Sequence, residues 1–166
     1  MSKTMAILLT STTLYAACAI DYVKKQTTQY HMETYESTVQ KLHGSQHDAF
    51  EKIADLSRWD AFKDKLPQDK IRDLTCDVDT CSFTVDPVGR VTLRIVDREP
   101  DKTVKFGADN LPVAFNLWIQ LKENALGETL MKITLKADLP FMLKTMLGSK
   151  LQQGVTQMAE MLARVL

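Results

Sequence analysis

The sequence predicts an α+β fold in which a curved, seven-stranded antiparallel sheet wraps around a long C-terminal helix. Two observations support this. Between residues 71 and 139, apolar and polar residues alternate along successive short segments, a period of two that is typical of antiparallel strands with one covered face. Residues 45–66 and 140–166 instead repeat apolar side chains at helical spacing, which predicts two short helices after the first strand and one long helix at the end.

The length and composition fit one globular domain. A chain of 166 residues buries about 68–70% of its unfolded surface, so it needs no disulfide or metal for stability. Lys and Arg total 21, as do Asp and Glu, so the formal net charge is zero. This balance gives no electrostatic footprint for nucleic acid or for an anionic membrane surface. We therefore expect no nucleic-acid partner.

The first strand is predicted over residues 34–42, where β-favouring residues are frequent, and Gly44 ends it. Ser45 then begins a short helix, with Asp48 three residues later in the capping-box position. A second short helix begins at Ser57. Its apolar side chains are Trp59, Phe62 and Leu66.

Six further strands follow, separated by turns that include two proline turns at residues 86–89 and 99–102. On each strand every second residue is apolar, and these residues are expected to face inward. They are Cys81, Phe83 and Val85, then Val91, Leu93 and Ile95, then Phe106, then Phe115, Leu117 and Ile119, and finally Met131, Ile133 and Leu135.

Pro140 ends the last strand and opens the long helix, which at 1.5 Å per residue is about 39 Å long. Its apolar stripe consists of Leu143, Leu147, Leu151, Val155, Met158, Leu162 and Leu166. Methionine adapts its shape to its surroundings. Met142 and Met146, near the helix start, are therefore candidates for a forgiving ligand wall or for plain core packing, whereas Met158 and Met161 are expected in the core.

The order of strand, helical pair, six strands and long helix is the helix-grip arrangement, in which the helical pair plugs one end of a half-closed sheet. The stretch SQHDAFEKIADLSRW, with Ser45, Phe50, Ile53, Asp55 and Trp59, resembles the opening helices of the SRPBCC superfamily, also called START-like or Bet v 1-like. The resemblance covers residues 33–166 and is nearest to small bacterial proteins of the polyketide cyclase/dehydrase type. It implies the binding or carriage of a small hydrophobic molecule between the sheet and the last helix.

The expected wall of this cavity is apolar and contains neither a catalytic group nor a metal ligand. Among the inward residues only Cys81 can titrate, and it is expected to be a small core side chain. No serine–histidine–aspartate arrangement and no glycine-rich phosphate loop is present, and we expect no cofactor. The predicted wall residues are Trp59, Phe62, Phe83, Leu93, Ile95, Phe106, Phe115, Leu117, Met131, Ile133, Met142, Leu143, Met146 and Leu147.

Two alternative functions stay open at this point. A cyclase-like enzyme would need inward acids or amides, for which Asp86, Asn110 and Asn116 are the nearest candidates. A protein-interaction module of the co-chaperone kind would need an exposed apolar patch, and Trp118, predicted on the outer face of the sheet, supports it. The sequence favours the non-enzymatic carrier and leaves its ligand and any protein partner unknown.

Cys76 and Cys81 flank the probable turn CDVDTC and are expected to lie opposite each other across a hairpin. With Cys18 the cysteine count is odd, which argues against a secreted disulfide framework. We therefore expect two small buried thiols in a reducing cytosol. A metal site would need two further ligands nearby.

Residues 1–31 precede the pattern of the domain and are interpreted as a leader. Lys3 and a mostly apolar run over residues 5–20 outline a signal peptide, and Cys18 stands where bacterial lipoproteins carry their lipid. The run is too short and too interrupted for stable membrane insertion. Alternatively, Met32 is the true start, or the leader packs as an extra helix. The expected location is cytoplasmic, with export or lipid anchoring through residues 1–20 as the alternative.

Overall fold

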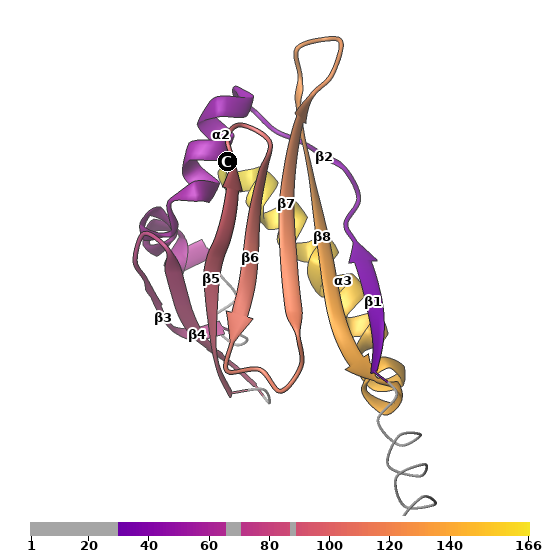
Figure 1. Ribbon diagram of the computed structural model, residues 1–166. Helices are drawn as coiled ribbons and strands as arrows, with labels where there is room; N and C mark the ends of the chain where they lie inside the picture. The colour runs from indigo at the N-terminus through magenta and orange to yellow at the C-terminus, as the bar shows by residue number, and fades with distance from the viewer. Residues whose placement is uncertain (1–29, 66–70, 87–88) are drawn as a thin grey trace, which may run out of the picture.

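The computed structural model describes residues 30–65, 71–86 and 89–166 (Figure 1). The elements are, in order, β1 (Tyr30–Glu36), β2 (Gln40–Lys41), α2 (Gln46–Ala54), the 3-10 helix η1 (Leu56–Lys65), β3 (Ile71–Cys76), β4 (Thr80–Val85), β5 (Gly89–Glu99), β6 (Thr103–Asp109), β7 (Phe115–Glu123), β8 (Thr129–Pro140) and α3 (Phe141–Val165). The predicted α+β class, the helical pair after the first strand and the long last helix are confirmed.

The strands form one antiparallel sheet in the order β1-β8-β7-β6-β5-β4-β3, and the short β2 also pairs with β8. The sheet has eight strands where seven are predicted, because the segment 34–42 is divided. Ser37 lies at the division. The backbone N–H of Ile133 donates to the Ser37 hydroxyl at 2.9 Å, and the Ser37 N–H donates to the Ile133 carbonyl. This side-chain bond replaces a regular ladder contact and separates β1 from β2.

β1 begins earlier than the predicted domain boundary. Tyr30 pairs with Pro140 and His31 with Leu139, so the first two residues of β1 belong to the segment that the sequence assigns to the leader. The pairing partners are the last residues of β8, whose position the long helix fixes. The other predictions for the leader concern residues 1–29 and lie outside the described residues.

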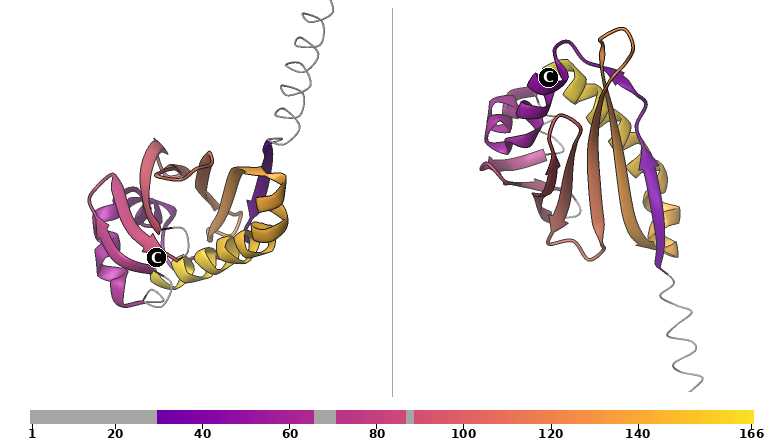
Figure 2. Two further views of the ribbon diagram at one scale, coloured as in Figure 1. Left: turned by 90° about the horizontal axis from the view of Figure 1, so that it is seen from below. Right: turned by 45° about the horizontal axis from the view of Figure 1, so that its top comes forward.

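Two helical layers cover the concave side of the sheet (Figures 1 and 2). α3 crosses behind the sheet from the end of β8 toward α2, and α2 with η1 covers the end at which α3 finishes. Ser45 caps α2 as predicted, since its side chain accepts from the Asp48 N–H at 3.0 Å. The apolar side of α2 faces the core, where its residues Ala49, Phe50 and Ile53 are buried.

α3 passes close to β1 at Gly148. A Cβ at Gly148 would lie 3.3 Å from the Tyr35 hydroxyl of β1, so a glycine permits this crossing. Beyond it, Val155, Ala159 and Leu162 are buried. No helix among the described residues is long and apolar enough to cross a membrane.

The hairpin of β3 and β4 differs from its prediction in one respect. Cys76 and Cys81 lie opposite each other, as expected, but they are joined in a disulfide instead of remaining thiols. Directly opposed residues of an antiparallel pair bring their side chains together, and the two Cα atoms are 4.1 Å apart. The same hairpin contains a register shift between Arg72 and Thr75, where Asp73 has a φ of 54°.

Candidate functional site

An apolar cavity of about 90 Å³ lies between the C-terminal half of α3 and the concave face of the sheet. Among the described residues, every side chain that lines it is hydrophobic. They are Trp59, Ile71, Leu74, Cys81, Phe83, Leu93, Phe106, Leu117, Met158, Met161, Leu162 and Val165.

The sheet supplies this wall through inward positions of neighbouring strands. Cys81 pairs with Leu93 between β4 and β5, and Phe106 pairs with Leu117 between β6 and β7. Because side chains alternate along a strand, both pairs face the same side of the sheet. They lie in neighbouring rows, since Leu93 is opposite Ala108 and Phe106 is opposite Ile95. Phe106 and Leu117 are almost fully buried, so they form the floor of the cavity.

Trp59 of η1 closes the cavity from the helical pair. Its ring lies 6.2 Å from that of Phe106, centroid to centroid, at an angle of 43°. The indole N–H donates to the Lys52 carbonyl at 3.3 Å, so the polar end of the side chain is paired while the apolar rings face the cavity.

The last two turns of α3 form the opposite wall. Met158, Met161, Leu162 and Val165 follow at spacings of three and four residues, which places them on one side of the helix. The Lys52 ammonium donates to the Leu166 carbonyl at 2.5 Å, so the end of α3 is tied to α2. The same contact holds the two helical layers together around the cavity.

The described part of the lining carries no ionisable group, since Cys81 belongs to the disulfide. The residues considered for a cyclase lie elsewhere. Asp86 is exposed and paired with Arg72, and Asn110 is exposed in a turn with a φ of 65°. Asn116 precedes the inward Leu117 on β7 and does not line the cavity. The cavity can therefore hold a neutral apolar molecule, and none of these three side chains reaches it.

The structure brings five of the predicted wall residues together at the cavity. They are Trp59, Phe83, Leu93, Phe106 and Leu117. Ile95, Met131 and Ile133 are buried in the core without lining it, while Phe115, Leu143 and Leu147 are half-buried. The side chain of Phe62 lies outside the described part.

Met142 and Met146 lie away from the cavity. They are 74% and 66% exposed. At about 100° per residue they occupy the side of α3 opposite to the buried Val155 and Leu162. Sequence reasoning placed the cavity at the helix start, whereas the wall formed by α3 comes from its last two turns.

Several lining residues were not in the predicted wall: Ile71, Leu74, Cys81, Met158, Met161, Leu162 and Val165. Most were recognised as inward or apolar and assigned to the core. The position of the helical pair α2 and η1 could have indicated that these residues line the cavity. Trp59 lies in the helical pair, so the cavity that it closes is at the end of the sheet where the pair and the last turns of α3 meet.

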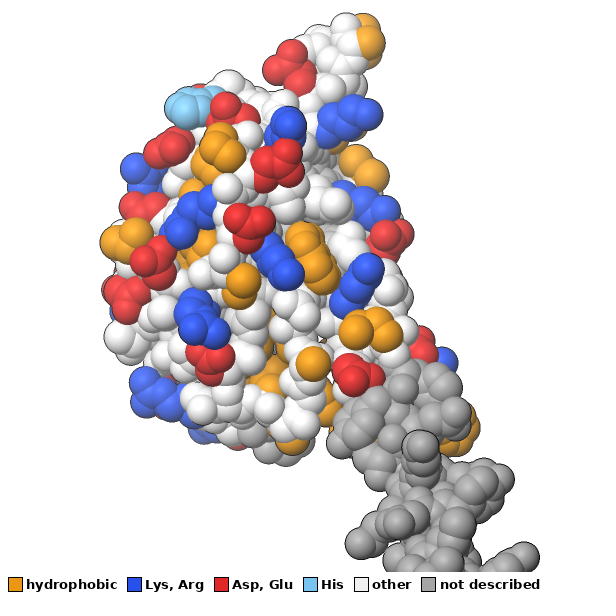
Figure 3. Space-filling view, viewed as in Figure 1, with side chains coloured by type: hydrophobic (Ala, Val, Ile, Leu, Met, Phe, Trp, Pro, Cys, Tyr) orange, Lys and Arg blue, Asp and Glu red, His pale blue; other side chains and the backbone are white. Residues whose placement is uncertain are grey.

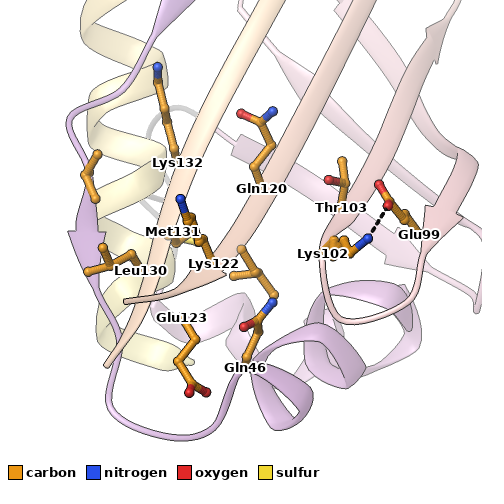
Figure 4. Close-up of a pocket in the computed structure, with 12 residues that line it drawn as sticks. Gln46, Glu99, Lys102, Thr103, Gln120, Lys122, Glu123, Leu130, Met131 and Lys132 are labelled. Atoms are coloured by element: carbon orange, nitrogen blue, oxygen red, sulfur yellow. Dashed lines mark hydrogen bonds and ion pairs between the residues drawn. The ribbon is translucent and has the colours of Figure 1, made fainter. Parts of the chain in front are cut away.

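A larger and more open cleft of about 710 Å³ lies beside the C-terminal part of β7 (Figure 4). Its lining is mixed: Leu121 and Met131 contribute apolar surface, and Glu99, Lys102, Lys122, Glu123 and Lys132 carry charge. Lys102 pairs with Glu99 at 2.9 Å, and Lys132 pairs with Glu36 at 2.8 Å. Since these charges neutralise each other and no polar groups converge, we do not assign a ligand site here.

The outer face of the sheet is polar and charged (Figure 3). Trp118 is half-buried there, as its outward position predicts, and no helix covers it. The ammonium groups of Lys105 and Lys136 lie 5.2 Å and 5.6 Å from its ring centroid. These cation–π contacts cover the indole with charge, so the face does not offer an apolar patch.

No protein-family model and no curated protein matches the sequence. Solved structures do match. Norcoclaurine synthase from Thalictrum flavum, in complex with dopamine and hydroxybenzaldehyde, aligns with a TM-score of 0.66 over 82% of this chain and 87% of that chain, at 11% identity. The Mll3558 protein from Rhizobium loti gives 0.57 over 82% and 99%, at 16% identity. The chain shares the helix-grip, Bet v 1-like fold of these structures.

The Bet v 1-like fold also occurs in DynU16, a protein of the dynemicin biosynthetic locus, with a TM-score of 0.53 over 79% of this chain and 46% of that chain, at 15% identity. Identities this low establish the fold alone. In this chain the apolar cavity lies between the sheet and the last helix.

Proposed function

We propose that the chain binds or carries a small, neutral, hydrophobic molecule in the cavity between α3 and the sheet. The observation that supports this proposal is the chemistry of the lining, in which all the described side chains are hydrophobic. Water gains no hydrogen bonds in such a space, so an apolar ligand has little competition there. The cyclase-like alternative finds no acid or base in the lining to support it.

The volume limits the size of the ligand. Drug-sized ligands occupy pockets of about 300–1,000 Å³, and an engineered apolar cavity of about 150 Å³ binds benzene. At about 90 Å³ this cavity suits a single small ring or a short alkyl chain. Met158 and Met161 form part of the wall, and because methionine side chains adjust easily, a larger ligand could displace them.

Binding is tested with two apolar probes of different size. Fluorobenzene, followed by fluorine NMR, fits the cavity as it stands, and the dye N-phenylnaphthylamine requires the methionines to move. Native mass spectrometry of the freshly purified protein asks whether a ligand is already bound. If neither probe binds and no ligand copurifies, the cavity is a packing defect and the proposal fails.

Leu93→Phe locates the binding site. The added ring fills the cavity, so we expect at least tenfold weaker fluorobenzene binding and little change in stability. Leu139→Phe is the matched control, because Leu139 is 3% exposed and does not line the cavity. It should destabilise the protein by about 1–3 kcal/mol through overpacking and leave the affinity of the folded protein unchanged.

We also infer from the Cys76–Cys81 disulfide that the chain works in an oxidising compartment. Disulfides persist outside the reducing cytosol, which favours the exported alternative over the expected cytoplasmic location. Alkylation of free thiols in intact cells, before lysis, should leave both cysteines unmodified. Modification of both cysteines would show that they are reduced in the cell and would support the cytoplasmic location instead.

A further inference from the structure

The first two turns of α3 expose large apolar side chains on more than one side. Phe141, Met142 and Met146, together named the α3 tip, are 67%, 74% and 66% exposed. At about 100° per residue, Phe141 and Met146 point about 140° apart. Leu143 and Leu147 add half-buried apolar surface on the side toward the sheet. A helix end that is apolar on so many sides favours an apolar surrounding over one flat partner.

The charged side chains of α3 that lie beside the α3 tip are all basic. Over residues 141–150 the only charged side chains are Lys144 and Lys150, and the first turn contains no acidic residue. Lys144 pairs with Glu33 of β1 at 2.5 Å, and Lys150 is exposed. Apolar side chains bordered by lysines have the charge order that suits phospholipid headgroups above an acyl layer. The zero net charge of the whole chain conceals this local arrangement.

The chain enters the sheet beside the α3 tip. Tyr30 pairs with Pro140, directly before α3, at the lower right of Figure 1 where β1 begins and β8 ends. In the sequence, residues 5–20 are mostly apolar, and Lys24 and Lys25 follow them. Residues 21–29 span at most about 30 Å, so this run ends within that distance of Tyr30.

We propose that the α3 tip is a docking surface for a phospholipid bilayer. Its three side chains enter the boundary between headgroups and acyl chains, and Lys144 and Lys150 remain among the headgroups. A fluid layer accepts side chains that point in several directions, which a rigid protein groove does not. This docking is peripheral and does not depend on what the internal cavity binds.

The full chain carrying Phe141→Trp tests the proposal. Leu126→Trp is the matched control, since Leu126 is 82% exposed at the β7–β8 turn, at the opposite end of the sheet. Both proteins are mixed with vesicles of phosphatidylcholine and a minority of phosphatidylglycerol, with and without bromine on the acyl chains. Emission of the unsubstituted chain accounts for Trp59 and Trp118.

We expect vesicles to shift the added emission of Phe141→Trp to the blue, and brominated lipid to quench most of it, while Leu126→Trp changes in neither respect. Adding Met142→Glu and Met146→Glu to Phe141→Trp should abolish the quenching. Equal behaviour of the two positions overturns the proposal. So does an emission at position 141 that is already blue-shifted without lipid and insensitive to vesicles, because residues 1–29 or a second copy would then cover the tip.

Discussion

At the scale of single residues, Tyr35 is the buried polar side chain that the fold leaves unpaired. Its hydroxyl has no hydrogen-bond partner within the described part of the chain, and burial, followed by Glu33, raises the pKa of the phenol. An unpaired buried hydroxyl has lost its water without compensation. We expect Tyr35→Phe to be neutral or to stabilise the protein by up to about 1 kcal/mol in urea unfolding. A clear loss of stability would mean that the hydroxyl binds water or ligand.

His47 links α2 to the turn between β5 and β6 and responds to pH. Its ring lies 2.7 Å from the Asp101 carboxylate, and this hydrogen bond raises the pKa of His47 above its ordinary value of 6.5. Because the folded pKa exceeds the unfolded one, the contact contributes fully below the ordinary pKa and is lost as pH rises through the raised value. Asp101→Asn should lower the pKa of His47 in an NMR titration. An unchanged pKa would show that the pair does not form.

At the scale of elements, alanine substitutions at two glycines of α3 distinguish the effect of helix propensity on stability from the effect of packing. Gly154 is exposed, and a Cβ there meets no atom within 4 Å, so Gly154→Ala should stabilise the protein by about 0.5–1 kcal/mol. At Gly148 the Cβ would lie 3.3 Å from the Tyr35 hydroxyl. Gly148→Ala should therefore stabilise less, or destabilise, in the same thermal unfolding measurement. Equal gains at both positions would mean that α3 crosses β1 more loosely.

Periodicity predicted much of the apolar stripe of α3, but not where along the helix the cavity lies. Leu143 and Met158 belong to the same predicted stripe, yet only Met158 lines the cavity. That difference depends on where α3 crosses the sheet and where η1 closes it, both of which are long-range contacts. Met142 and Met146 illustrate the same limit of prediction from sequence. Methionine side chains suit a ligand wall, but the helix turns these two toward solvent.

For the whole molecule, the order of elements along the chain and the helix-grip arrangement followed from the sequence, but the first residues of β1 did not. Tyr30 and His31 carry no apolar alternation of their own and are recognised as strand only through pairing with Pro140 and Leu139. A chain that begins at Tyr30 should therefore keep the melting temperature of the full chain. One that begins after Met32 should melt several degrees lower, about 1 kcal/mol, because those pairs are lost. A lower melting temperature for both would show that residues 1–29 stabilise the domain.

Among the described strands, β1 and β3 lie at the two ends of the open sheet, and a strand at a sheet edge can template the strand of another molecule. On β3, the register shift between Arg72 and Thr75 and the left-handed Asp73 interrupt the row of free backbone groups. On β1, the Gln152 amide of α3 donates to the Glu36 carbonyl at 2.7 Å and occupies one end of the edge. The register shift in β3 and the contact of Gln152 with β1 thus hinder the addition of strands from other molecules. The sheet can therefore stay open around its cavity without closing into a barrel.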